Sequence, residues 1–131
     1  MTIKLYPLTF EPILKERIWG GTKLNSFLNK KIDSNNIGES WELSTVPNDI
    51  SVVNNGLLKG KSINELIDLY AVSFLGKKVV EQFGNQFPLL FKFIDAQQDL
   101  SIQLHPNDAL AKQRHNSFGK TEMWYVMQAD P

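Results

Sequence analysis

The sequence predicts a mixed fold of the α+β class, mainly β with helices, for this chain of 131 residues. Several short runs alternate apolar and polar residues with the period of two that is typical of β-strands, and turn-forming residues separate them. The clearest helical pattern lies upstream of residue 85 and is not interleaved with these runs, so a βαβ arrangement is not indicated. The length fits a single domain, 1–131.

The first part of the chain combines short extended pieces with turns. We expect extended pieces at residues 3–5 and 8–10, a turn at 17–21, one or two helical turns at 23–29, a polar loop at 33–36, and strands at 41–46 and 51–53. Asn55-Gly56 favours a turn after the last of these strands, because both residues tolerate a positive φ.

The best helix signal begins at Ser62. Ser62 and Glu65 form a capping box, in which each side chain satisfies a backbone N–H of the first turn. Apolar residues then follow at helical spacing, and Gly76 supplies a stop. A second helix is expected at 79–83, with Gly84 after it. The segment from about 1 to 85 therefore holds strands and a helical region.

Strand patterns dominate the segment from about 86 to 131. Residues 87–94 are apolar on both faces, which suits a strand covered on both sides. Residues 100–105 alternate strictly, and a second strand-like run begins at Lys120. Between them, a short helix is expected at 107–113.

Polar residues on these last strands suggest a metal site. Gln103 and His105 lie two residues apart, so they point to the same side of an extended chain. Lys120 and Glu122 repeat that spacing in the next strand-like run. If the two strands lie side by side, an amide oxygen, an imidazole and a carboxylate converge beside an ammonium group. Imidazole and carboxylate are ordinary zinc ligands at about 2.0–2.2 Å, and an incomplete ligand shell suits catalysis.

The same residues also fit less specific roles. Gln103 and His105 are compatible with a solvated strand face, and an exposed Lys120–Glu122 ion pair would contribute only about 0–1 kcal/mol. Ser101 points to the same side, where its hydroxyl suits a sugar or phosphate oxygen, or simply water. Lys120 suits a phosphate contact or proton transfer, although a lone lysine is more often a solvated charge.

Trp19 is a further candidate for the functional site, whereas His115 is not. Trp19, which precedes Gly20-Gly21, fits either the wall of a sugar pocket or the core, because aromatic faces stack on apolar sugar faces and also pack well. His115 lies in a polar, helix-like stretch, so we expect it to be a surface residue.

Composition argues against several classes of function. The chain has 14 basic and 14 acidic residues and a formal net charge of zero, so nothing indicates binding to nucleic acid or to an anionic membrane. Without cysteine it has no disulfide, thiolate metal site or cysteine nucleophile. No apolar run resembles a signal peptide or approaches the ~20 residues of a membrane span. We expect a soluble, cytoplasmic protein.

Several motifs, in order along the chain, resemble the type I mannose-6-phosphate isomerases. The metal-site motif is Gln103-x-His105-Pro106, followed by KTEMWY at 120–125. Upstream, the matching segments are RIWGG at 17–21, IGESWELS at 37–44 and FPLLFKFIDA at 87–96. They match the N-terminal portion of the family in order and spacing. The resemblance covers nearly the whole chain, and an ordered set of motifs is far more specific than any one of them.

The resemblance implies a fold and an activity. Family members are built on cupin-type β-barrels, or jelly rolls, with an added helical region. On this reading residues 86–131 supply metal-site strands of an incomplete barrel, with a strand at 122–128, and the chain is the N-terminal part of a longer isomerase. The implied activity is metal-dependent interconversion of mannose 6-phosphate and fructose 6-phosphate through an enediol.

The resemblance also implies the roles of individual residues. It assigns zinc binding to Gln103, His105 and Glu122, substrate contacts to Ser101 and Lys120, and a catalytic role to Lys120. The family's fourth ligand, a histidine, and a catalytic arginine belong to the part of the family pattern that this chain does not match.

Two other classes of function stay open. In one, the chain is a non-catalytic metal-binding or sugar-phosphate-binding module, which would bind metal without turnover. In the other, it is active only when another chain completes it, and activity would rise steeply with protein concentration. An unpaired strand edge at 122–128 would also promote self-association.

Overall fold

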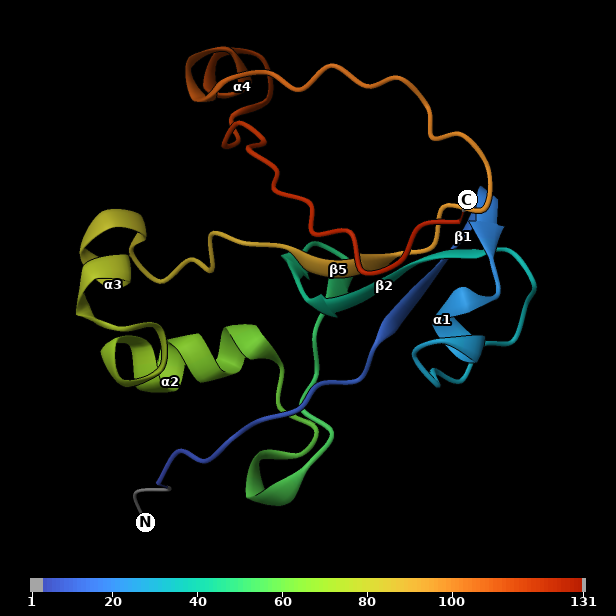
Figure 1. Cartoon of the computed structure of the whole chain (residues 1–131). Helices are drawn as coiled ribbons and strands as arrows, with labels where there is room; N and C mark the ends of the chain where they lie inside the picture. The colour runs from blue at the N-terminus through green and yellow to red at the C-terminus, as the bar shows by residue number, and fades with distance from the viewer. Residues whose placement is uncertain (1–3, 131) are drawn as a thin grey trace. The chain divides into compact units, whose positions relative to one another are not determined.

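The computed structural model describes residues 4–130, so the extended piece expected at 3–5 lies partly outside the described residues. The chain divides into two compact units at the Asp99–Leu100 boundary. The predicted class is confirmed, because helices accompany antiparallel sheets (Figure 1). The described residues form no closed barrel. A single domain with an internal division near residue 85 stays a prediction.

The first unit is built on a three-stranded antiparallel sheet in the order β1-β2-β5. The strands of this unit are β1 (Ile13–Gly21), β2 (Ile37–Leu43), β3 (Thr45–Val46), β4 (Asp49–Ile50) and β5 (Phe91–Ile94). β3 and β4 form a separate two-stranded sheet. In the central strand β2, Glu39 pairs with Lys15 of β1 and with Ile94 of β5. Figure 1 shows β2 and β5 running alongside each other.

The turn expected at residues 17–21 is wrong, because these residues complete β1. Gly21 pairs with Ile37 after an irregularity in the register. A Cβ at Gly20 would lie 2.4 Å from the backbone nitrogen of Gly38, a separation that real Cβ atoms do not reach. Gly20 therefore permits close approach of β1 and the start of β2, a role that the sequence pattern does not distinguish from a turn.

The strand expected at residues 51–53 is wrong as a continuous element. Val53 bridges Phe10, and Val52 bridges Ser62, each as an isolated bridge. Because Val52 and Val53 pair with different segments, each makes a single bridge and the two do not extend into a ladder of strand hydrogen bonds.

The helices of the first unit follow the local signals. They are α1 (Lys23–Ser26), the 3₁₀ helix η1 (Gly56–Leu58), α2 (Ile63–Leu75) and α3 (Lys77–Phe83). The predicted capping box of α2 is confirmed: the Glu65 N–H donates to Ser62 Oγ at 3.2 Å, and the Ser62 N–H donates to Glu65 Oε2 at 2.8 Å. Leu66 of α2 packs with Val53 and Leu58 in the core. None of the described helices is long and apolar enough to span a bilayer.

The second unit holds a single described helix, α4 (Asp108–His115), which is N-capped by Asn107. The strands expected at 100–105 and 122–128 are wrong for the described residues, which form no ladder there. Alternation specifies two faces of an extended chain, but a strand also needs a neighbour for its N–H and C=O groups. Without one, Ile102 and Leu104 are 105% and 96% exposed.

Candidate metal and substrate site

Two of the predicted metal ligands, His105 and Glu122, lie in contact in the second unit. Nε2 of His105 is 3.1 Å from Oε2 of Glu122. Nζ of Lys120 is 3.2 Å from the other carboxylate oxygen, Oε1. Glu122 therefore presents one oxygen to each neighbour, and the loops on either side of α4 supply these groups. The structure brings these three residues together, and their roles stay predictions.

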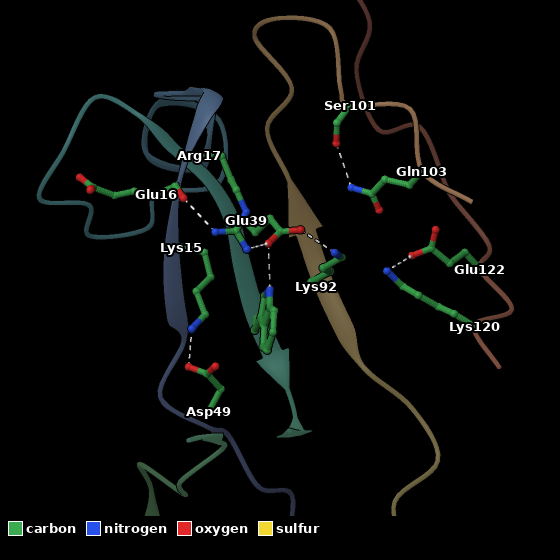
Figure 2. A network of polar contacts seen from close by, with 11 residues as sticks. Lys15, Glu16, Arg17, Glu39, Asp49, Lys92, Ser101, Gln103, Lys120 and Glu122 are labelled. Atoms are coloured by element: carbon green, nitrogen blue, oxygen red, sulfur yellow. Dashed lines mark hydrogen bonds and ion pairs between the residues drawn. The ribbon is translucent and has the colours of Figure 1, made fainter. Parts of the chain in front are cut away.

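Gln103 and Ser101 form a separate contact in the same unit (Figure 2). The Gln103 amide nitrogen donates to Ser101 Oγ at 3.0 Å. This bond uses the nitrogen, so the amide oxygen, which is the atom that would bind a metal, is not the engaged atom. Among the described residues, no three or more His, Cys, Asp and Glu side chains are grouped to hold a metal. A set of three protein ligands here therefore depends on the Gln103 amide.

The donor atoms of His105 and Glu122 have the chemistry and spacing that a divalent metal requires. Two zinc bonds of about 2.0–2.2 Å at a tetrahedral angle separate their ligand atoms by about 3.3–3.6 Å. The two atoms are 3.1 Å apart, so a shift of a few tenths of an ångström (about 0.2–0.5 Å) would admit the ion. The side chains are 26% and 29% exposed, which leaves them accessible from solvent.

The charges around Glu122 favour its ionised form. Desolvation raises the pKa of Glu122, but the hydrogen bond and charge of Lys120, together with His105, outweigh it and lower the pKa below its usual value. The ionised carboxylate is the form that binds metal, so these neighbours favour the form that the predicted ligand role of Glu122 requires.

Trp19 belongs to β1 in the first unit. Its indole is half-buried and lies against the backbone of β2, because a Cβ at Gly38 would come within 2.6 Å of Trp19 Cζ3. The Trp19 carbonyl also accepts a hydrogen bond from the Gln97 N–H at 2.9 Å. This packing explains the residue structurally, and its sugar-binding role stays a prediction. His115 is exposed at the end of α4, as expected of a surface residue.

The sequence patterns do not single out a second polar cluster, which surrounds Glu39 in the first unit (Figure 2). The Glu39 side chain is only 7% exposed, and it accepts hydrogen bonds from Arg17 Nη2 at 2.6 Å and Lys92 Nζ at 2.5 Å. Trp41 Nε1 donates to the same carboxylate at 3.3 Å. The available signal was Lys92, a single charge in the apolar run 87–94, which requires a partner once it is partly buried.

The Glu39 cluster joins three strands through charge. Burial raises the pKa of Glu39, but hydrogen bonds from Lys92 and Trp41 and the nearby positive charges lower it below the usual value. Arg17 comes from β1, Glu39 from β2 and Lys92 from β5, so each strand of the sheet supplies one charged member. The cluster therefore ties the sheet together through one ionised carboxylate.

A family model and individual relatives of known name point to the same protein family. Residues 8–126 match the model for the catalytic domain of phosphomannose isomerase type I. The chain is 45% identical over 122 residues to mannose-6-phosphate isomerase ManA of Bacillus subtilis (strain 168), covering 92% of this chain and 37% of the relative. It is 40% identical over 128 residues to a mannose-6-phosphate isomerase of Streptococcus mutans serotype c, covering 95% and 38%.

Solved structures agree with the sequence relatives. The crystal structure of the mannose 6-phosphate isomerase from Bacillus subtilis matches with a TM-score of 0.76 and 38% identity, over 86% of this chain and 35% of that chain. A mutant phosphomannose isomerase from Salmonella typhimurium matches with a TM-score of 0.68 and 26% identity, over 81% and 27%. The chain thus spans between a third and two-fifths of the length of the curated relatives named above. A match of this extent shows that the chain belongs to the type I phosphomannose isomerase family.

Proposed function

We propose that this chain carries zinc-binding and substrate-binding residues of a mannose-6-phosphate isomerase. The observation that carries the proposal is the 3.1 Å contact between His105 and Glu122, because both residues occupy positions that the family motif assigns to zinc. The names of the relatives support the same activity, since they are mannose-6-phosphate isomerases.

The proposed reaction interconverts mannose 6-phosphate and fructose 6-phosphate through an enediol. A bound zinc ion would supply Lewis-acid stabilisation of charge on the sugar O1 and O2 oxygens. His105 would contribute a ring nitrogen to the ion and Glu122 a carboxylate oxygen. Gln103 would contribute its amide oxygen while its amide nitrogen keeps the bond to Ser101.

Lys120 and Ser101 are assigned to the phosphorylated hexose. The Lys120 ammonium has three donors, and one of them is directed to Glu122, so the others can reach a phosphate or sugar oxygen. Its side chain is 44% exposed, which keeps it accessible to substrate. The same group is our candidate for assisting proton transfer between C1 and C2. Trp19 is the candidate for stacking on the sugar.

A paired measurement of metal content and turnover tests this function. Zinc per chain is determined after dialysis, and fructose 6-phosphate formation is followed in a coupled assay. We expect about one zinc per chain and zinc-dependent turnover, both lost in His105→Ala, because the imidazole is a ligand. His115→Ala is the matched control, since it removes the exposed histidine of α4, and it should change neither quantity.

The outcomes separate the two halves of the proposal. No bound zinc in protein that is folded by circular dichroism, or equal zinc in His105→Ala, would contradict the metal site. Bound zinc without turnover would contradict the isomerase activity of this chain and leave the metal site standing.

A further inference from the structure

We propose that Asp108 and Gly119 form a clasp that positions Glu122 relative to His105, an inference that rests on the proposed metal site. The clasp consists of two hydrogen bonds. The Gly119 N–H donates to Asp108 Oδ1 at 2.8 Å. The next N–H along the chain, that of Lys120, donates to the Pro106 carbonyl at 3.3 Å. Together they hold the chain after α4 against the chain that enters it.

Gly119 is required at this point because two backbone segments nearly touch. A Cβ at Gly119 would lie 2.6 Å from Asp108 N, 2.7 Å from Asn107 C and 2.8 Å from Pro106 O. All three atoms belong to the backbone, so no flexible side chain can move aside. The φ of Gly119 is outside the left-handed region, so the requirement is one of space and not of backbone conformation.

The helix between the two ends is closed at both termini, which makes it a defined spacer. Asn107 caps its start by accepting the Leu110 N–H at 3.0 Å. At its end Asn116 adopts the left-handed conformation, with φ 50° and ψ 38°, and its N–H donates to the carbonyls of Ala111 and Lys112. This C-terminal cap stops the helix at His115, and the chain returns toward the start of α4.

The clasp places the two ligands on short arms. His105 lies three residues before Asp108, and Glu122 lies three residues after Gly119. Without the clasp, bringing the ligands together closes a loop of 17 residues. Eight of these residues belong to the capped helix α4, so about nine are flexible without the clasp. The bond from Lys120 to Pro106 leaves about three flexible residues, and the dependence of closure entropy on length then favours the contact about fivefold. Neither clasp residue is a ligand, so both are positioning residues.

Three variants and one control test the clasp. Gly119→Ala places a Cβ where two backbone segments nearly touch, and Asp108→Ala removes the oxygen that accepts the hydrogen bond from the Gly119 N–H. Asp108→Asn keeps the acceptor oxygen but not the charge, so it should behave as the unaltered chain if the hydrogen bond is what matters. Ser117→Ala is the matched control in the same loop. Zinc affinity is measured by chelator competition, with zinc alone as the ligand.

We expect Gly119→Ala and Asp108→Ala to bind zinc about five- to tenfold more weakly, with Asp108→Asn and Ser117→Ala unchanged. A second readout, nuclear Overhauser effects between the His105 ring and the Glu122 side chain, needs no metal. These effects should persist in Asp108→Asn and Ser117→Ala and disappear in Gly119→Ala and Asp108→Ala. The Gly119 amide should be protected from hydrogen exchange only where the acceptor remains.

The readouts distinguish failure of the clasp from failure of the proposed function. If the Overhauser effects persist in Gly119→Ala and Asp108→Ala, the clasp does not position Glu122 and the inference is overturned. Unprotected Gly119 in the unaltered chain would also overturn it. If no variant binds zinc while the Overhauser effects respond as expected, the metal site is contradicted and the positioning role is upheld.

Discussion

Replacing Glu39 by glutamine gives the sharpest test of the energetics of the first unit. Glu39→Gln keeps the shape of the side chain and removes the charge that holds Arg17 and Lys92. The amide can still offer one oxygen to a cation, but its NH₂ group then faces the other cation. Lys92, whose side chain is only 18% exposed, would be left without its full counter-charge.

The expected loss in the free energy of unfolding follows from the contacts of Glu39. Each hydrogen bond to a charged group contributes about 1.5–3 kcal/mol, and removing one partner of a fully buried ion pair costs about 3–5 kcal/mol. Arg17 is 36% exposed and can turn to water, which reduces the loss on its side. We therefore expect the free energy of unfolding to fall by about 2–4 kcal/mol.

Urea unfolding followed by circular dichroism measures this loss. Glu16→Gln is the matched control, because Glu16 is an exposed residue of β1. Its backbone carbonyl, which the substitution leaves in place, accepts the hydrogen bond from Arg17 Nη1 at 2.9 Å. The control should stay within about 0.5 kcal/mol of the unaltered chain. A loss below about 1 kcal/mol in Glu39→Gln, at an unchanged m-value, would refute the assigned energy.

The pH dependence supplies an independent check with a defined sign. The pKa of Glu39 is lowered in the folded chain from its ordinary value of 4.5. The carboxylate therefore stabilises the fold fully above pH 4.5, and this contribution is lost as the pH falls through the folded-state pKa. The stability difference between the unaltered chain and Glu39→Gln should shrink in acid. A difference that is constant down to acid unfolding would contradict the charge-based explanation.

Three further predictions concern other parts of the chain. Hydrogen bonding to Lys61, and then to Ser62, lowers the pKa of Glu65 to about 2, so Glu65→Gln should unfold more easily at neutral pH and match the unaltered chain once the pH has fallen through about 2, as measured by thermal unfolding. Gly20→Ala should destabilise the first unit by about 1–3 kcal/mol in urea, because its Cβ would meet backbone at 2.4 Å. The exposed apolar residues of 100–105 and 122–127 should cause concentration-dependent association in sedimentation velocity, reduced by Ile102→Lys; a monomer at all concentrations would argue against it.

Local signals in this sequence predict structure better than signals that need a distant partner. The capping box at Ser62 and Glu65 involves residues three apart, so α2 begins where the sequence indicates. Gly20 has the same local sequence whether it makes a turn or admits a neighbouring strand, and only the distant segment around Gly38 decides between the two. Glu39 escapes notice for a similar reason, since its two cationic partners lie 22 and 53 residues away in sequence.

The convergence of His105 and Glu122 has a different physical origin from the one that the sequence suggests. The alternation of 100–105 and the spacing of Lys120 and Glu122 indicate a pair of neighbouring strands, and the described residues form no such ladder. The groups meet all the same, because the capped helix α4 and the Asp108–Gly119 contact return the chain to its starting point. Closure of the loop around α4 is local, so it needs no strand partner to bring these two predicted ligands together. Gln103 lies outside that loop, and it contacts Ser101 within its own segment. Of the three predicted ligands, Gln103 is thus the one whose position depends most on the pairing of strands.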